Sequence, residues 1–310
     1  MAFLTIFTAP KPFTNPHVAL IQRNAMRSWQ YLGNDVEVLM IGDEPGMAAV
    51  SKELKVKQLM DVQRNSFGTP LLSSIFDSGR NHGTGAIFAY VNTDILLSPG
   101  FQKSIRLVAN QFKRFLIIGQ RWDLDIKEEL GFSGGWEKRL EERLIVSGRR
   151  HPRGGSDFFV YPRACFEQIP EFALGRAGWD NWMIYHARAK GWPVVDATDT
   201  ICIVHQTHDY SHLPGGQPHY RLPESADNLR LAGGRRTIFS LDDADKRLVT
   251  SSVYPAKLSW KKFWREIEIF PLIKLHSHLL TQLLFVIIHP LQAFREFKLS
   301  VSRTRHGDTN

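Results

Sequence analysis

The chain has 310 residues, of which 43% are hydrophobic and 23% charged, and this composition is ordinary for a globular protein with one sizeable core. The formal charge of +8 is uneven, because residues 251–310 carry nine lysines and arginines against four acidic residues. Basic residues beside apolar ones favour an anionic membrane surface as a partner. Nucleic acid is not expected as a partner, since the sequence lacks the basic, aromatic-rich motifs of RNA-binding sheets.

Cysteine usage and the N-terminus favour a cytoplasmic location. Cys165 and Cys202 are too few for a disulfide framework, so both are expected to be reduced thiols. Residues 1–7 lack the basic segment and the apolar length of a signal peptide, and they are predicted to enter the first strand. We therefore expect a cytoplasmic protein, with a peripheral position at the inner face of the membrane if the basic tail binds lipid.

Strands and helices are predicted to alternate over the first hundred residues, with strands at 3–8, 36–41, 55–59 and 86–91 and helices at 15–32, 47–54 and 69–80. Pro70 is expected at the start of the third helix. This alternation predicts an α/β fold with a parallel sheet covered on both faces. Further along, we expect helices at 101–112, within 128–146 and at 179–190, and strands at 115–120, 158–161 and within 194–204. Residues 206–255 are expected to form loops and short helices.

The most informative segment is an apolar, β-rich run from residue 86 to 97 that is interrupted by Asn92-Thr93-Asp94. A buried strand thus delivers a carboxylate to its end. Ligands of open α/β sheets bind beyond the carboxyl ends of the strands, where Asp94 could hold a metal ion that clamps a diphosphate. The alternative is a turn in which the carboxylate only caps backbone amides.

Three further polar motifs follow in order along the chain: Gly154-Gly155-Ser156-Asp157, Gly178-Trp179-Asp180-Asn181, and His205 at the end of an apolar run. Together with Asn92-Thr93-Asp94, this order resembles the GT-A class of nucleotide-sugar glycosyltransferases, of the family-2-like type, over about residues 1–210. The resemblance implies a Rossmann-like GT-A fold over residues 1–225, with a central, mostly parallel sheet flanked by helices. Residues 226–310 would form a loop and helical extension that ends in a possible membrane-associating tail.

In this family a D-x-D motif binds the donor diphosphate through a divalent metal, and a late histidine completes the metal shell. Here Asn92 stands in place of the first acid, so Asp94 and His205 are the metal-ligand candidates. Oxygen-rich coordination with one imidazole suits Mn²⁺ or Mg²⁺ better than Zn²⁺. Asn92 can still hydrogen-bond a ribose hydroxyl or a metal-bound water.

The resemblance also implies where the nucleotide binds, with a UDP-sugar or GDP-sugar as the expected donor. Thr8 at the end of the first strand and Glu44 after the second are assigned to donor binding. Arg64 and Asn65 lie where the family contacts the nucleotide. They could equally be ordinary loop residues.

A second D-x-D pattern occurs at Asp123-Leu124-Asp125. It ranks below Asn92–Asp94, which lies after the third strand-helix unit, where the family places its metal motif. Asp123 and Asp125 are instead expected to contact the donor sugar or the acceptor, to which Gly155 and Asp157 are also assigned. The alternative for this segment is a solvated turn.

Asp180 is the candidate catalytic base, as the resemblance implies for an acid at a helix start in inverting members. A carboxylate held near the acceptor oxygen can remove the hydroxyl proton. Trp179 and Trp182 flank it and could form a sugar-stacking wall. The alternative makes Asp180 an N-cap and both tryptophans core residues.

Three more histidines follow His205, at positions 208, 212 and 219. The H-E-x-x-H spacing of a zinc site is absent, so they are expected to be mostly surface or acceptor-loop histidines. Farther on, the apolar run Leu279–Ile288 is too short to span a bilayer, which needs about twenty residues. The tail is therefore expected to be either a buried core helix or a peripheral anchor.

The function expected from this sequence is metal-assisted, inverting transfer of a sugar from a nucleotide donor to a hydroxyl acceptor on a polysaccharide, glycan or glycolipid. Two alternatives remain. A sugar-phosphate nucleotidyltransferase would use the same sheet and metal for attack at phosphorus and would release pyrophosphate. A non-catalytic sugar-binding or membrane scaffold protein would keep the fold without turnover.

Overall fold

The computed structural model describes residues 1–208 and 222–307, with side chains described up to residue 298. The chain forms two compact units. The first comprises residues 1–187 and 192–256, and the second comprises residues 188–191 and 257–310. The first unit thus continues beyond residue 225, where the sequence suggests the end of the main domain.

A nine-stranded sheet forms the centre of the first unit, with the strand order β13-β12-β10-β6-β9-β4-β1-β2-β3. Most neighbours are parallel; β9 runs antiparallel to both β4 and β6, and β13 runs antiparallel to β12. The mostly parallel α/β sheet predicted from the sequence is therefore confirmed. Its strands are β1 (Leu4–Thr8), β2 (Val36–Ile41), β3 (Lys57–Leu59), β4 (Ile87–Val91), β6 (Leu116–Ile118), β9 (Phe158–Pro162), β10 (Val194–Asp196), β12 (Lys246–Val249) and β13 (Ser252–Pro255).

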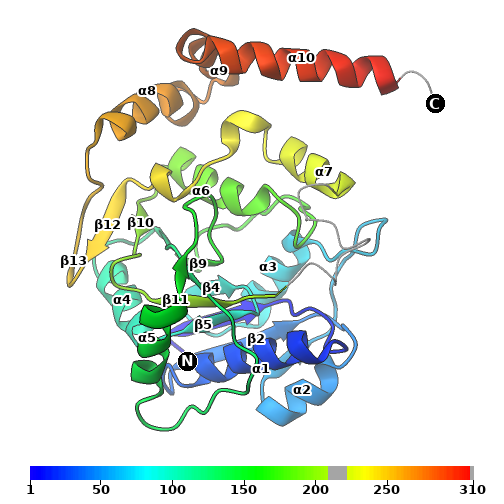
Figure 1. Cartoon of the computed structure of the whole chain (residues 1–310), viewed down its shortest axis with the longest axis vertical. Helices are drawn as coiled ribbons and strands as arrows, with labels where there is room; N and C mark the ends of the chain where they lie inside the picture. Colours follow the sequence, from blue (N-terminus) through cyan, green and yellow to red (C-terminus); the bar gives the residue numbers. More distant parts are fainter. Residues whose placement is uncertain (209–221, 308–310) are drawn as a thin grey trace. The chain divides into compact units, whose positions relative to one another are not determined.

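Helices cover both faces of this sheet (Figure 1). One face packs against α1 (Pro16–Gln30), α2 (Met47–Leu54) and α4 (Gly100–Ala109), and the other packs against α3 (Leu72–His82) and α6 (Trp179–Ala189). Alternation along β1 explains both layers: Leu4 and Ile6 join the core that contains Trp29 of α1, whereas the Phe7 ring meets Phe76 of α3 edge-on at 5.1 Å. A strand buried on both faces reads as a continuous apolar run, as β1 and β4 do.

A smaller sheet has the strand order β5-β11-β7-β8, and all four of these strands follow β4 in the sequence. Its strands are β5 (Ile95–Leu97), β7 (Trp122–Leu124), β8 (Arg149–Arg150) and β11 (Ile203–Gln206), and the helix α5 (Trp136–Ser147) packs against it through a second apolar core. Parallel pairing of β7 with β11 places Asp123 opposite His205. This pairing, between residues far apart in sequence, shapes the candidate site.

Two expectations about local structure are wrong. Helix α3 begins at Leu72 rather than at Pro70, because the preceding segment is extended: Pro70 forms a β-bridge with Arg64, and the Leu71 amide donates to the Gln63 carbonyl. Residues 206–255 contain more than loops and short helices, because α7 (Pro223–Leu231) precedes the hairpin β12–β13, which extends the large sheet. The Lys-Arg-Leu-Val and Ser-Val-Tyr-Pro segments are each only four residues long, too short for alternation to be recognised.

The second unit is helical, with α8 (Trp260–Lys274), α9 (His278–Ile288) and α10 (Pro290–Gly307). Ser259 and Ser277 cap α8 and α9 by accepting backbone amides of the first turn, as N-cap serines commonly do. Within the described residues, no helix combines the length and apolarity needed to cross a bilayer.

Candidate functional site

The site is built at the edge of the large sheet where its central parallel strands end. Loops after β1, β4 and β6 meet there, and because β9 is antiparallel its amino end reaches the same edge. The Asn92 amide accordingly donates to the Asp157 carbonyl at 3.0 Å, across the β4–β9 pair. Polar residues from distant parts of the chain are thus collected where open α/β sheets bind their ligands.

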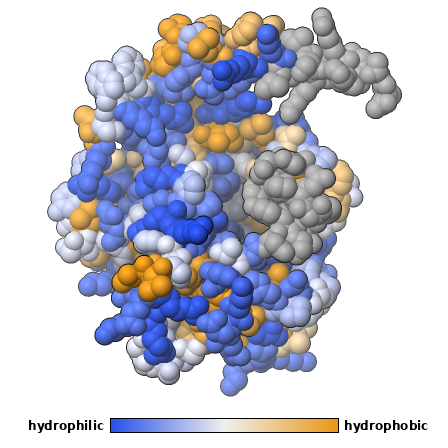
Figure 2. All heavy atoms as spheres, viewed as in Figure 1, coloured by the Kyte–Doolittle hydropathy of each residue, from blue (hydrophilic) through white to orange (hydrophobic). Residues whose placement is uncertain are grey.

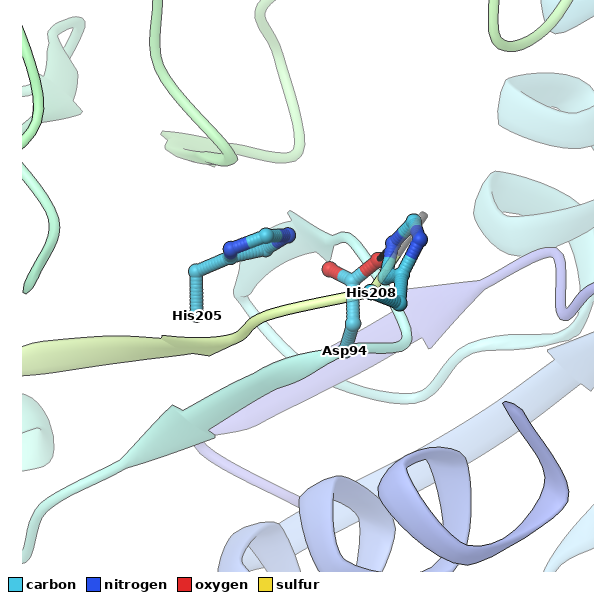
Figure 3. Close-up of side chains that lie close together, drawn as sticks. All are labelled: Asp94, His205 and His208. Carbon is cyan, nitrogen blue, oxygen red and sulfur yellow. Dashed lines mark hydrogen bonds and ion pairs between the residues drawn. The ribbon is translucent and has the colours of Figure 1, made fainter. Parts of the chain in front are cut away.

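Asp94, His205 and His208 form a cluster in which one carboxylate oxygen and two imidazole nitrogens lie within 4.8 Å of one another. Figure 3 shows the Asp94 carboxylate between the two rings, with one oxygen towards each. The antiparallel pair β5–β11 positions them, since His205 lies opposite Ile95 and the Gln206 amide donates to the Asp94 carbonyl. The sequence identified Asp94 and His205 as metal-ligand candidates but grouped His208 with the surface or acceptor-loop histidines; its side chain is 9% exposed and contacts Asp94.

The two carboxylate oxygens of Asp94 differ in their surroundings. Asp94 Oδ1 is buried and has no hydrogen-bond partner among the described residues, a costly state for a carboxylate oxygen. One carboxylate with two imidazoles is a suitable donor set for a divalent transition ion. The second imidazole also shifts the preference from Mg²⁺ towards Mn²⁺, because Mg²⁺ favours all-oxygen ligands.

Lys11 and His208 both contact the other Asp94 oxygen. Lys11 Nζ lies 3.1 Å from Asp94 Oδ2, and His208 Nε2 lies 3.1 Å from the same atom. Burial alone would raise the pKa of Asp94, but the Lys11 charge and the His208 hydrogen bond hold that pKa well below its ordinary value. Asp94 is therefore ionised at any physiological pH.

His205 is oriented by the carboxylate of Asp123, which belongs to the second D-x-D pattern. His205 Nδ1 lies 3.1 Å from Asp123 Oδ1, and His151 Nδ1 lies 2.8 Å from Asp123 Oδ2. Against the effect of burial, the His205 hydrogen bond and the charge of Arg121 lower the pKa of Asp123 below its ordinary value. A carboxylate on one imidazole nitrogen fixes the ring so that its other nitrogen faces a metal.

Arg121 joins this part of the site to the loop before β9. Its guanidinium donates to Asp123 Oδ1 at 2.9 Å and to Asp157 Oδ1 at 2.7 Å, and Asn92 Nδ2 donates to the same Asp157 oxygen at 3.0 Å. Asn92 and Asp157, which the sequence assigned to different substrate groups, are therefore direct partners. The sequence reading attached no role to Arg121.

Asp180 is half-buried at the first turn of α6, beside the Gly154–Asp157 loop. A Cβ atom built on Gly155 would lie 2.6 Å from Asp180 Oδ2, so only glycine allows this approach. Burial raises the pKa of Asp180 to about 6; a backbone hydrogen bond from Asn181 opposes the rise, and the charge of Asp157 adds to it. A carboxyl with this pKa can exchange a proton near neutral pH, as a general base must.

The two tryptophans beside Asp180 lie in the core. Trp179 and Trp182 are only 6% and 7% exposed. Trp179 packs edge-on against Tyr90 at 5.3 Å, and Trp182 packs against Phe172 at the same centroid distance. Their burial favours the alternative in which they hold α6 against the sheet rather than forming a wall for a sugar.

The remaining candidate donor residues lie at the end of β1, after β2 and in the segment before α3. Thr8 is fully buried, and its Oγ1 lies 2.8 Å from that of Thr93. Arg64 donates to Asp43 and to Glu44, the latter at 2.9 Å. Asn65 donates to the buried Glu224 at 2.7 Å and organises its own loop.

Asp125 occupies a different environment from Asp123. It is 58% exposed, pairs with Lys127 at 3.0 Å, and lines a cleft of about 390 Å³ that also includes His208. The other lining residues are Asn15, His17, Val18 and Thr207. The cleft therefore adjoins the metal-ligand cluster. His212 and His219 lie outside the described residues.

The comparisons with known proteins give distant structural matches. No protein-family model and no curated protein matches the sequence. One similar solved structure is the mannosyltransferase PcManGT from Pyrobaculum calidifontis in complex with GDP-Man and Mn²⁺, with 11% identity, a TM-score of 0.43 and coverage of 68% of this chain and 58% of that one. Another is S. aureus TarS 1-349 in complex with UDP-GlcNAc, with 10% identity, a TM-score of 0.48 and coverage of 75% and 65%. These structural neighbours are glycosyltransferases, but at such values the likeness leaves the activity of this chain to be argued from its own site.

Proposed function

We propose that this protein is a GT-A-type glycosyltransferase that moves a sugar from a nucleotide donor to a hydroxyl acceptor with inversion. The observation that carries the proposal is the buried Oδ1 of Asp94, which has no hydrogen-bond partner among the described residues and belongs to a carboxylate set between two imidazoles at the edge of the sheet (Figure 3). A divalent ion at this position would neutralise charge on a departing diphosphate. Asp94, His205 and His208 would hold it, with Mn²⁺ preferred to Mg²⁺.

Asp180 is the proposed catalytic base. Its pKa of about 6 leaves it ionised at neutral pH and able to accept the proton of an attacking hydroxyl. Direct attack by the activated hydroxyl on the sugar carbon inverts the configuration. Gly155 and Asp157, which adjoin Asp180, would contact the sugar or the acceptor.

The donor would be a UDP-sugar or GDP-sugar bound along the same edge. Thr8, Glu44, Arg64 and Asn65 are proposed to contact the nucleotide, with Asn92 near the ribose through its side-chain oxygen. The cleft at Asp125 is proposed to receive the acceptor, a glycan or a lipid-linked sugar. Trp179 and Trp182 would support this region from the core.

The test is a screen of nucleotide sugars for metal-dependent hydrolysis, starting with GDP-mannose and UDP-N-acetylglucosamine. Transferases commonly hydrolyse their donors slowly without an acceptor, so release of free sugar with Mn²⁺ and its loss with a chelator would support the proposal. Release of pyrophosphate from a nucleoside triphosphate would support a nucleotidyltransferase instead. No turnover of any substrate would favour a binding or scaffold protein.

Replacing Asp123 with Asn is expected to weaken Mn²⁺ binding about 10- to 100-fold, the usual effect of removing a carboxylate that orients a metal-binding histidine. Titration calorimetry with MnCl₂ measures it. Asp125→Asn is the matched control from the same D-x-D pattern and should leave the Mn²⁺ affinity unchanged, because Asp125 pairs with Lys127. Equal losses in both variants would contradict the orienting role of Asp123.

The second unit is proposed to bind an anionic membrane surface, which would bring the enzyme to a lipid-linked acceptor. Large apolar side chains are exposed along all three helices, among them Trp260, Leu279, Ile287, Leu291 and Phe294, and Figure 2 shows apolar atoms gathered over α9. Lysines and arginines on α8 and α10 supply the charge that anionic lipid attracts.

Replacing Leu279 and Ile287 together with Ser is expected to lower binding to phosphatidylglycerol vesicles at least about tenfold, because each inserted aliphatic side chain contributes about 1.5–3 kcal/mol. Both are more than 70% exposed, so folding should not suffer. Ile145→Ser with Val146→Ser, equally apolar and exposed but in the first unit, is the control. If full-length protein stays in the supernatant with these vesicles at low salt, the membrane proposal fails.

A further inference from the structure

Lys11 introduces a positive charge into the cluster proposed to bind a metal. Its Nζ lies 3.1 Å from Asp94 Oδ2 and 2.8 Å from His208 Nε2. Its side chain is 30% exposed, so the ammonium reaches the buried carboxylate while remaining open to solvent on another side. The ammonium therefore contacts two of the three proposed metal ligands.

The position of Lys11 is fixed by its surroundings. It lies between Pro10 and Pro12 in the loop after β1, and prolines fix their own φ and keep the preceding residue extended. The Lys11 amide donates to Gln22 Oε1 at 2.7 Å, and Gln22 Nε2 donates to the Lys11 carbonyl at 3.0 Å. Gln22 is only 1% exposed, so these two hydrogen bonds hold the Lys11 backbone in place.

A divalent ion and the Lys11 ammonium cannot both use the lone pair of His208 Nε2. An ion bound by Asp94 Oδ1 and His208 Nε2 would lie roughly 2.0–2.2 Å from each, next to the ammonium that contacts the same nitrogen and the other Asp94 oxygen. Two cations so close repel each other strongly in a partly buried site. The ammonium must therefore swing away when the ion binds, while its clamped backbone keeps it within reach of the ion's ligands.

We propose that Lys11 is a resident cation of the site, which competes with the divalent ion for Asp94 and His208 and binds the diphosphate of the donor directly. The claim that Lys11 binds the donor diphosphate rests on the proposed function, whereas the claim that Lys11 competes with a divalent ion does not. An ammonium beside the leaving group stabilises the same negative charge as the ion. Donor binding should therefore persist in part without metal.

Lys11→Met tests the proposal through two effects of opposite sign. Without nucleotide, its Mn²⁺ affinity should be at least about tenfold higher than that of the wild type, because the competing charge is gone. In EDTA, its affinity for UDP or GDP should be about tenfold lower, because the ammonium that contacts Asp94 and His208 is lost. Titration calorimetry measures both, and Lys11→Arg should keep Mn²⁺ binding weak and metal-free nucleotide binding largely intact.

Lys127→Met is the matched control, since Lys127 is 77% exposed and pairs with Asp125 at the adjoining cleft. It should change neither affinity. Unchanged or weaker Mn²⁺ binding in Lys11→Met would overturn the competition, and unchanged nucleotide binding in EDTA would overturn the direct contact. If the proposed sugar transfer is wrong, no donor will release free sugar. The Mn²⁺ and nucleotide titrations do not depend on that result.

Discussion

Asp180→Asn is expected to slow sugar transfer by about two to four orders of magnitude, the usual loss when a general base is removed, and to make the folded protein more stable at neutral pH. The amide keeps the shape of the side chain and an oxygen that can accept the backbone amides of the α6 first turn. It lacks the charge that burial penalises. Activity and stability should therefore change in opposite directions.

The pH dependence follows from the raised pKa of Asp180, about 6 in the folded protein against an ordinary value of 3.8. Because the base must be ionised, the wild-type transfer rate should fall as pH drops through about 6. Between these two pKa values the folded state binds more protons than the unfolded state, so this carboxyl reduces the free energy of unfolding as pH rises from about 4 to 6. The full penalty, on the order of 3 kcal/mol, is present at pH 7, and the Asn variant removes it.

Single-turnover transfer, donor titration and denaturant unfolding at pH 5 and pH 8 measure these effects. Asp157→Asn provides a comparison, since loss of its charge should move the pH midpoint of transfer to a lower value. Transfer by Asp180→Asn within a few-fold of the wild type would make Asp180 a helix cap. Asp157 or Asp125 would then be the next candidate for the base.

Sequence reasoning worked best where a local pattern decides the structure. The strand at 36–41 and the helix at 47–54 were predicted with the bounds observed for β2 and α2, since apolar runs and flanking glycines mark them. The polar end of the strand at 86–91 also indicated the edge of the sheet where Asn92 and Asp94 lie, because parallel strands share one carboxyl edge.

The parts that sequence could not predict depend on pairings between distant segments. Lys11 contacts Asp94 and His208 only because β1 and β4 are neighbours and β11 returns beside β5. Asp123 orients His205 because β7 pairs in parallel with β11. Neither pairing has a local sequence signal. The sequence could therefore rank the D-x-D pattern at 123–125 below Asn92–Asp94, but it could not show that the two motifs lie beside each other in space. The same holds for His208, whose spacing in the chain resembles no metal motif.

Asp94→Asn is expected to weaken metal-stimulated donor binding by more than about 100-fold, since it removes the only carboxylate among the three proposed ligands. Removing a residue that merely orients a ligand already lowers metal affinity about 10- to 100-fold. Its effect on stability should be opposite to that of Asp180→Asn. The pKa of Asp94 lies well below its ordinary value, so its charge stabilises the fold at every pH above about 4, and that contribution is lost as pH falls further. The Asn variant lacks it, and Lys11 and His208 lose the carboxylate that they contact.

Calorimetry with UDP or GDP, with and without Mn²⁺, measures the loss of binding, and circular dichroism checks that the fold persists. Asp43→Asn, which removes an exposed carboxylate beside Arg64, controls for a general change in charge near the nucleotide. If Mn²⁺ stimulates nucleotide binding equally in wild type and Asp94→Asn, Asp94 is not a metal ligand. If binding in EDTA falls in Asp94→Asn as well, the carboxylate also holds Lys11 in place for the diphosphate, because an ammonium without its anion no longer has a fixed position at the site.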